Sequence, residues 1–275
     1  EEGKSVKGSI EFRRIMDNKN QYLEDLKAID TTKASVLRTL FARKAKDYDF
    51  AIRSMRSGRL DTNKIAEATQ GVQTIYERIG NIKTDKLTVT VLIDESGSMH
   101  GRNKIEKARQ AAVFINEVFS KVPNVQLFIY GHTADENRID TNILVYREPG
   151  HMNQPYALGN VEARSNNRDG SAILSVAKRV RKHTSNAGIL LVLSDGQPSA
   201  NGYGGHAAVQ DTRRCVTEAQ KLGFQVVQIA IEEDVRSEKM FDYFIKMTDI
   251  KNLPIDMVNY LSRKVDRLVK ERITL

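Results

Sequence analysis

The sequence predicts an α/β protein built on a doubly wound, mostly parallel β-sheet with an N-terminal helical appendage. From residue 87 onward, short apolar runs alternate with longer amphipathic segments, which is typical of strands connected by helices. The runs at 87–93 and 188–194 are almost wholly apolar, as expected for strands buried on both faces of a parallel sheet. We therefore expect residues 83–275 to form the α/β domain and residues 1–82 to form the appendage.

The appendage is predicted from apolar residues that recur at helical spacing in its first half. No strand is expected within residues 1–80. Asp61 or Thr62 is expected to cap a short helix, and Gly71 and Gly80 to end two helical pieces.

Five strands and three long helices are expected in the α/β domain. The strands are placed at 87–93, 125–130, 143–146, 188–194 and 224–231. The helices are placed where apolar residues step by three and four, at 102–121, 171–183 and 205–222. A closing helix is also expected, from a stripe formed by Met257, Leu261, Val265 and Leu268.

The composition excludes some classes of protein and raises others as alternatives. No run approaches the roughly 18 apolar residues that indicate a membrane span. The single cysteine, Cys215, excludes an internal disulfide and is expected to be a buried, inert thiol, which predicts a cytoplasmic location. The net charge of +8 raises nucleic-acid binding as an alternative function, although the basic residues form no single run and are not interleaved with aromatic residues.

Residues 94–98, which read Asp-Glu-Ser-Gly-Ser, carry the most specific chemical signal. Asp94, Ser96 and Ser98 place three short oxygen-bearing side chains at the end of a strand expected to be central. Short side chains hold their oxygens close to the backbone, and oxygen ligands in fixed positions are what Mg2+ requires. We predict a metal site here. The alternative is a turn in which Ser98 only caps the next helix.

A second carboxylate is expected at the same edge of the sheet. Asp195 directly follows the apolar run at 188–194, and the functional crevice of such sheets lies at the carboxyl ends of the strands. Alone, Asp195-Gly196 is a common turn pair. Together with Asp94, it indicates a converging site.

The Asp-x-Ser-x-Ser run resembles the metal-ion-dependent adhesion site of von Willebrand factor A (VWA) domains, which have a Rossmann-like fold. The resemblance implies Mg2+, or Mn2+ or Ca2+ at the same site, held directly by Ser96 and Ser98. Asp94 and Asp195 would act through water. VWA domains usually supply a Thr from a further loop. Here Asn167 stands at that position and Asp169 lies two residues on, and either oxygen could serve. The alternative is that Asp169 merely caps a helix that starts at Gly170.

Further motifs are similar to those of two VWA subgroups, the CobT-type cobaltochelatase subunit and the NorD-type nitric oxide reductase activation protein. The motifs are Asn-Arg-Asp-Gly-Ser-Ala-Ile at 167–173, Leu-Ser-Asp-Gly-Gln-Pro at 193–198, and Tyr-Gly-Gly-His at 203–206 with Asp-Thr-Arg-Arg at 211–214. This resemblance implies a non-catalytic adaptor that works with an AAA+ ATPase of the MoxR or CobS type. A client protein would supply an acidic residue to the metal.

An enzymatic alternative is a phosphotransferase of the haloacid-dehalogenase kind with Asp94 as nucleophile. Such enzymes need a second Asp as general acid where this chain has Ser96, and a serine hydroxyl cannot take that role at neutral pH. No catalytic residue is therefore predicted. The histidines show no metal-ligand spacing, and we expect His132 to be an ordinary loop histidine near the rim of the site.

Overall fold

A seven-stranded sheet lies at the centre of the computed structural model, which describes residues 9–44, 48–82, 87–123, 125–135, 140–148, 155–186, 188–231 and 237–247. Across the sheet the strands are β1 (Ile10–Arg14), β7 (Thr141–Arg147), β6 (Val125–Ala134), β5 (Leu87–Asp94), β8 (Gly188–Ser194), β9 (Phe224–Ala230) and β10 (Phe244–Lys246). Neighbouring strands in this described sheet are parallel, except for the antiparallel pair β6 and β7. The predicted doubly wound, mostly parallel sheet is confirmed.

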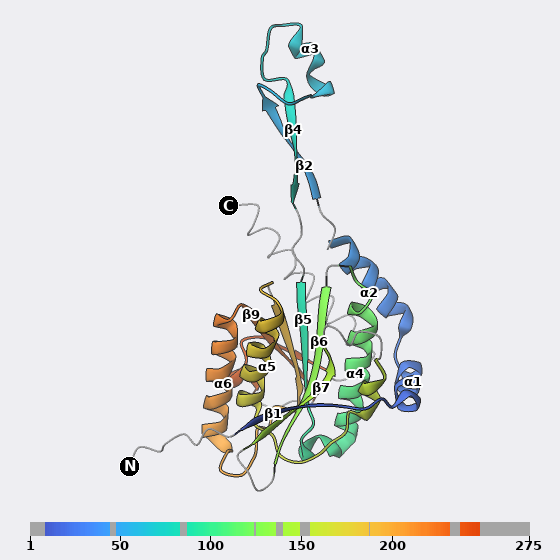
Figure 1. Cartoon of the computed structure of the whole chain (residues 1–275), viewed down its shortest axis with the longest axis vertical. Helices are drawn as coiled ribbons and strands as arrows, with labels where there is room; N and C mark the ends of the chain where they lie inside the picture. The colour runs from blue at the N-terminus through green and yellow to red at the C-terminus, as the bar shows by residue number, and fades with distance from the viewer. Residues whose placement is uncertain are drawn as a thin grey trace, which may run out of the picture.

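Helices cover both faces of the sheet (Figure 1). On one face lies α4 (Lys104–Phe119), with α1 (Lys19–Ala28) and α2 (Thr31–Lys44) packed against it. On the other lie α5 (Asp169–His183) and α6 (Gly205–Lys221), followed in the chain by the short α7 (Ser237–Met240). The three long helices predicted for the domain are confirmed as α4, α5 and α6. The predicted stripe at 257–268 lies outside the described residues.

None of the described helices combines the length and apolar character that crossing a membrane requires.

Side chains of the central strand alternate between the two layers of the core. Val89, Val91 and Ile93 pack in the cluster that contains α4, whereas Leu92 packs in the cluster that contains α5 and α6. This alternation continues past the last apolar residue. It therefore directs Asp94 toward the α5 side of the sheet.

The N-terminal segment is not purely helical, and the expectation that residues 1–80 contain no strand is wrong. Strand β1 runs parallel to β7 at the edge of the sheet, with Ile10 opposite Thr141. It reads Ile-Glu-Phe-Arg-Arg, and none of its residues is fully buried. Apolar and polar residues alternate over its first four positions, but this run is too short to indicate a strand on its own, and the pairing with β7 places it in the sheet.

The helices of this segment, which the sequence did predict, share the core of the sheet domain. The Tyr22 hydroxyl of α1 donates a hydrogen bond to Glu117 Oε1 of α4 at 2.8 Å, and the Tyr22 ring meets Tyr156 edge-on with centroids 5.6 Å apart. The buried Asp25 accepts a hydrogen bond from Arg109 Nε of α4 at 2.6 Å. Residues 9–44 are thus fastened to α4 and to the 3-10 segment η3 (Pro155–Asn160).

A separate three-stranded antiparallel sheet follows α2, in the order β2 (Tyr48–Met55), β4 (Tyr76–Ile82) and β3 (Arg59–Leu60). Gly80 lies in β4, so the expectation that it ends a helix is wrong. The predicted cap is confirmed, because Asp61 Oδ1 accepts a hydrogen bond from the Asn63 amide at the start of η1 (Thr62–Lys64), which leads into α3 (Ile65–Ala68). The small sheet projects beyond the amino end of β5, at the opposite end from Asp94 (Figure 1).

The close packing of α1 on η3 predicts that Gly159→Ala destabilises the protein. A Cβ at Gly159 would lie 2.2 Å from the Asn18 carbonyl oxygen and 2.9 Å from the Tyr22 amide nitrogen, and backbone atoms cannot swing away. We expect a loss of about 1–3 kcal/mol in the free energy of unfolding, measured by urea denaturation. Gly101→Ala is the control, since no heavy atom lies within 4 Å of its added Cβ. Equal stability of the two variants would mean that α1 does not pack on η3.

Candidate metal centre

Asp94 and Asp195 lie at the ends of the adjacent strands β5 and β8, and neither is exposed. Each carboxylate stabilises the turn that follows it, because it accepts a hydrogen bond from the backbone amide two residues further along the chain. The distances are 2.9 Å from the Ser96 amide to Asp94 Oδ1 and 3.1 Å from the Gln197 amide to Asp195 Oδ1. Gly196 has a φ of +75°, which a residue with a Cβ rarely adopts. The two loops thus point their carboxylates inward by local backbone geometry.

The hydroxyls of Ser96 and Ser98 lie 2.9 Å apart at the mouth of the same site. Ser98 is exposed and lies inside η2 (Gly97–Asn103), which shows no side-chain cap hydrogen bond, so the alternative that Ser98 is merely a helix cap is wrong. Both hydroxyls line a cleft of about 390 Å³, shared with further polar groups from the two loops that approach from α5 and β8. An oxygen-lined cleft therefore opens directly beside the buried carboxylates.

Asn167 and Asp169, the two alternatives for the further loop, have different surroundings. Asn167 is engaged at both ends of its amide: Nδ2 donates to Asp94 Oδ2 at 2.9 Å, and Oδ1 accepts from the Ser199 amide at 2.6 Å. Asp169 begins α5 and is fully buried, and neither of its carboxylate oxygens has a hydrogen-bond partner among the described residues. The alternative that Asp169 caps α5 is wrong, because Arg168 is the N-cap residue and no side chain makes a cap hydrogen bond.

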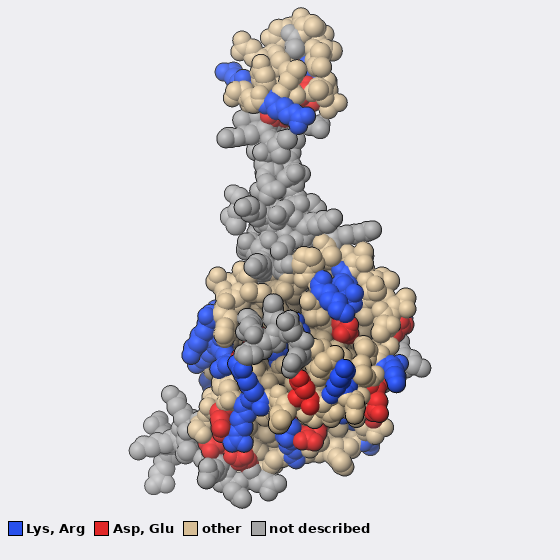
Figure 2. Space-filling view, turned by 45° about the vertical axis from the view of Figure 1, so that its right-hand side comes forward, with Lys and Arg blue, Asp and Glu red and all other residues tan. Residues whose placement is uncertain are grey.

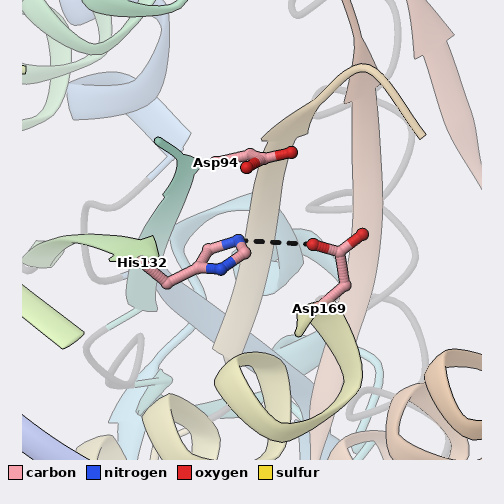
Figure 3. Close-up of side chains that lie close together, drawn as sticks. All are labelled: Asp94, His132 and Asp169. Atoms are coloured by element: carbon pink, nitrogen blue, oxygen red, sulfur yellow. Dashed lines mark ion pairs between the residues drawn. The ribbon is translucent and has the colours of Figure 1, made fainter. Parts of the chain in front are cut away.

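His132 belongs to the site, and the expectation of an ordinary loop histidine is wrong. It lies in β6, directly opposite Asp94 in the register of the parallel pair β5–β6, and it is fully buried. Its Nε2 is 3.4 Å from Asp169 Oδ1 (Figure 3). Ligand atoms of Asp94, His132 and Asp169 all lie within 4.8 Å of one another. This position of His132 could have been predicted from the two-residue period of a strand. His132 follows Phe128 and Tyr130, which lie on the same face of β6.

Lys104, the first residue of α4, is the second residue that sequence analysis missed. Its Nζ donates to Asp195 Oδ2 at 2.8 Å, in an ion pair whose side chains are 9% and 0% exposed. Directly before it, Arg102 and Asn103 have φ values of 54° and 56°, a left-handed conformation uncommon for residues other than glycine. No local motif marks this pairing, since it joins residues 91 positions apart.

The electrostatics of the cluster follow from burial and like charge. Burial raises the pKa of Asp94 to about 7, with the charge of Asp195 adding to the rise. Burial also raises the pKa of Asp169 well above its ordinary value, and Asp94 and Asp195 contribute. Burial lowers the pKa of His132 to about 3, so its ring is neutral at neutral pH. The carboxylates therefore have a strong affinity for a positive charge, whether a proton or a metal cation.

Glu95 braces the site from the other side of the sheet. It accepts hydrogen bonds from the Tyr146 hydroxyl at 2.7 Å and from Arg164 Nε at 3.0 Å, and its carbonyl accepts from the Arg164 amide at 2.7 Å. Gly131 on β6 makes room, since a Cβ there would lie 1.8 Å from Glu95 Oε1. These contacts hold the loop that leads to Asp169 against the loop that follows Asp94.

A divalent cation suits this donor set. Asp169 offers two oxygens that no described group uses, and Asp94 retains lone pairs beyond its two hydrogen bonds. The residues that could hold the ion are Asp94, Asp169 and His132 in the interior and Ser96 and Ser98 at the mouth. Asp195 is paired with Lys104, and Asn167 orients Asp94.

The fold and this site define a VWA domain. The family model of the von Willebrand factor type A domain matches residues 88–247, more than half of the chain, and the chain belongs to this family. The VWA resemblance drawn from the sequence is thereby confirmed.

Individual relatives are distant. The chain is 25% identical over 228 residues to the uncharacterized protein YojO of Bacillus subtilis (strain 168), covering 77% of this chain but only 35% of that relative's length. Among solved structures, the SpRpn10 VWA domain is 14% identical with a TM-score of 0.43, covering 61% of this chain and 93% of its own. A von Willebrand factor type A structure from Catenulispora acidiphila is 13% identical with a TM-score of 0.43. That match covers 78% of this chain and 49% of the Catenulispora chain.

The raised pKa values predict that Asp169→Asn stabilises the metal-free protein at high pH. When the pKa of a carboxyl group is higher in the folded than in the unfolded state, the protonated group stabilises the fold at pH values below about 4. This stabilisation is lost as the pH rises through the pKa of the folded state. In EDTA at pH 8, we expect the variant to exceed wild type by on the order of 1–2 kcal/mol in unfolding free energy, with the gap shrinking toward pH 5. Asp17→Asn, at an exposed position, is the control. A gap that does not change with pH would contradict the like-charge account.

The Lys104–Asp195 pair predicts a second effect on stability. Lys104→Met keeps the length of the side chain but leaves Asp195 buried without its cation, which commonly costs about 3–5 kcal/mol. The site also becomes more negative, so a divalent ion should raise the melting temperature more in this variant than in wild type. Thermal melting with EDTA or added metal measures both effects, with Lys107→Met one turn along α4 as control. A smaller metal response in Lys104→Met than in wild type would contradict this reading.

Proposed function

We propose that this VWA domain is an adaptor that binds a divalent cation and uses it to hold an acidic side chain of a partner protein. The observation that carries the proposal is the fully buried carboxylate of Asp169, both of whose oxygens lack a described hydrogen-bond partner while Asp94 lies beside it. Leaving a buried carboxylate unsatisfied is costly, and a cation would satisfy it.

We assign each residue of the proposed metal site a role according to its position and contacts. Asp169 is our choice for the place where VWA domains usually have Thr, because Asn167 already uses both ends of its amide. Ser96 and Ser98 face the cleft, where the family resemblance implies that they contact the ion. Lys104 and Asn167 keep Asp195 and Asp94 in place. The resemblance implies Mg2+, or Mn2+ or Ca2+ at the same site, and the proposed function requires only that a divalent ion supplies a positive charge with an exchangeable ligand position.

The partner's acidic residue would enter through the cleft. Its lining includes Ser96, Ser98 and Ser199, which offer donors to a carboxylate but no opposing charge. No general acid or nucleophile with a base is needed for such binding. We accordingly propose a non-enzymatic role.

The motifs that resemble those of CobT-type and NorD-type proteins are the basis for proposing a more specific role. They suggest that the chain couples an AAA+ ATPase of the MoxR or CobS type to a client protein, as a non-catalytic subunit of a chelatase-like or activation complex. We place it in the cytoplasm, where a buried thiol such as Cys215 stays reduced; burial raises the pKa of that thiol to about 11 and keeps it inert.

Two features weigh against the alternatives raised by the sequence. A haloacid-dehalogenase-like phosphotransferase would need a carboxylic acid two residues after Asp94 as general acid, and that position is Ser96, whose hydroxyl lies beside that of Ser98. A nucleic-acid binder would be expected to show a continuous basic surface. On the face drawn in Figure 2, Lys and Arg side chains are instead interspersed with Asp and Glu.

The proposal predicts that partner binding requires both the ion and the two hydroxyls. We expect binding to the MoxR- or CobS-type ATPase of the source organism, or to its client, to fall by at least about 10-fold in EDTA and in Ser96→Ala or Ser98→Ala, and to return when divalent metal is added to wild type. Biolayer interferometry with purified components measures it.

The serine variants should keep the fold, because each loses only a hydroxyl, and circular dichroism checks this. Ser185→Ala, which follows the carboxyl end of α5 far from Asp169, is the matched control. Binding that ignores EDTA and both serine changes would place the interface elsewhere, and residues 1–80 would be the first region to test.

A further inference from the structure

We infer that His132 is a metal ligand, and that the site takes a first-row transition ion of the kind that binds imidazole, such as Zn2+ or Fe2+, in preference to Mg2+. This assignment rests on the proposed function, since it concerns the ion at the same centre. It changes the chemistry of that centre from oxygen ligands alone to mixed nitrogen and oxygen ligands.

Three separate elements bring the ligand atoms together (Figure 3). Asp94 ends β5, and His132 lies opposite it on β6. Asp169 starts α5, which covers that face of the sheet. The His132 ring points toward the Asp169 carboxylate, with Nε2 3.4 Å from Oδ1. The cluster therefore depends on the packing of α5 over the central strands and not on one flexible loop.

The polar atoms of this cluster lack partners. Nδ1 and Nε2 of His132 and both carboxylate oxygens of Asp169 are buried, and none makes a hydrogen bond to any described group. A direct His132–Asp169 hydrogen bond is the alternative. At 3.4 Å it is longer than an ordinary N–H···O bond of about 2.7–3.2 Å, and it would leave Nδ1 and Oδ2 unsatisfied. A metal ion in contact with both residues would use a nitrogen and an oxygen at once.

The charge of the centre fits a dication. Asp195 is paired with Lys104, which leaves Asp94 and Asp169 to the ion, and the charges of these two carboxylates match those of one M2+. Asp94 is held in orientation by the Ser96 amide and by Asn167 Nδ2, as ligating carboxylates commonly are.

The nitrogen donor decides the class of ion. Imidazole suits Zn2+, Fe2+, Ni2+ and Cu2+, whereas Mg2+ and Ca2+ favour carboxylate, carbonyl and water oxygens. Two carboxylates and one imidazole make three protein ligands, a number that leaves an open position for a further ligand in catalytic zinc sites. Ser96 and Ser98 line the cleft through which that ligand would enter.

The test compares Co2+, a spectroscopic stand-in for Zn2+ and Fe2+, with Mg2+ on metal-stripped full chain. We expect wild type to bind Co2+ at least about 10-fold more tightly than Mg2+ in calorimetric titration. His132→Asn should lower Co2+ affinity by about 10- to 100-fold, change the visible d–d spectrum of the Co2+ form, and alter Mg2+ affinity less than about 3-fold. His183→Asn, at the far end of α5, is the matched control and should behave as wild type.

X-ray absorption of Co2+-loaded wild type tests the ligand without any substitution, and should show imidazole scattering that His183→Asn retains. The inference is overturned if that scattering is absent, or if His132→Asn lowers Co2+ and Mg2+ affinity equally or neither. Those results would leave the proposed function standing as long as some divalent ion binds. Failure of wild type to bind any divalent ion would overturn both.

Discussion

The like charge gathered at one edge of the sheet is the constraint on which the rest of the centre depends. Asp94, Asp169 and Asp195 are all fully buried, so water cannot screen their mutual repulsion. The surrounding structure offsets part of it: Lys104 neutralises Asp195, and Asn167 donates to Asp94. Asp169 receives no such help from the described residues. A bound cation is the group that would complete the balance, and this need underlies the proposed function.

Rigid elements hold the cluster together from both faces of the sheet. The parallel register of β5 and β6 fixes Asp94 beside His132, and α5 is packed so that its first residue reaches both. On the opposite face, Glu95 ties the loop before α5 to β5 through Arg164. Metal selectivity needs ligands held in place by their supports, and Asp94, His132 and Asp169 are each fully buried where β5, β6 and α5 meet.

The centre and the appended elements lie at different ends of the molecule. The small sheet of β2, β3 and β4 precedes β5 and projects beyond its amino end (Figure 1). The cleft is lined by residues that follow the carboxyl end of β5, such as Ser96 and Ser98. Helices α1 and α2 are fastened to the side of α4. Among the described residues, the small sheet therefore does not cover the cleft, an arrangement that suits the proposed adaptor.

The sequence alone determined the α/β class, the core strands and helices, and the placement of Asp94, Ser96 and Asp195 at strand ends, because apolar periodicity and short motifs are local signals. Tertiary structure decided what depends on distant partners. Strand β1 has only a short apolar–polar alternation of its own, and its pairing with β7 places it in the sheet. Lys104 meets Asp195 across 91 positions, and His132 joins the centre through the register of β6 on β5. Asn167 and Asp169 could be separated only once their contacts were seen, since spacing along a chain does not say which oxygen is already bonded.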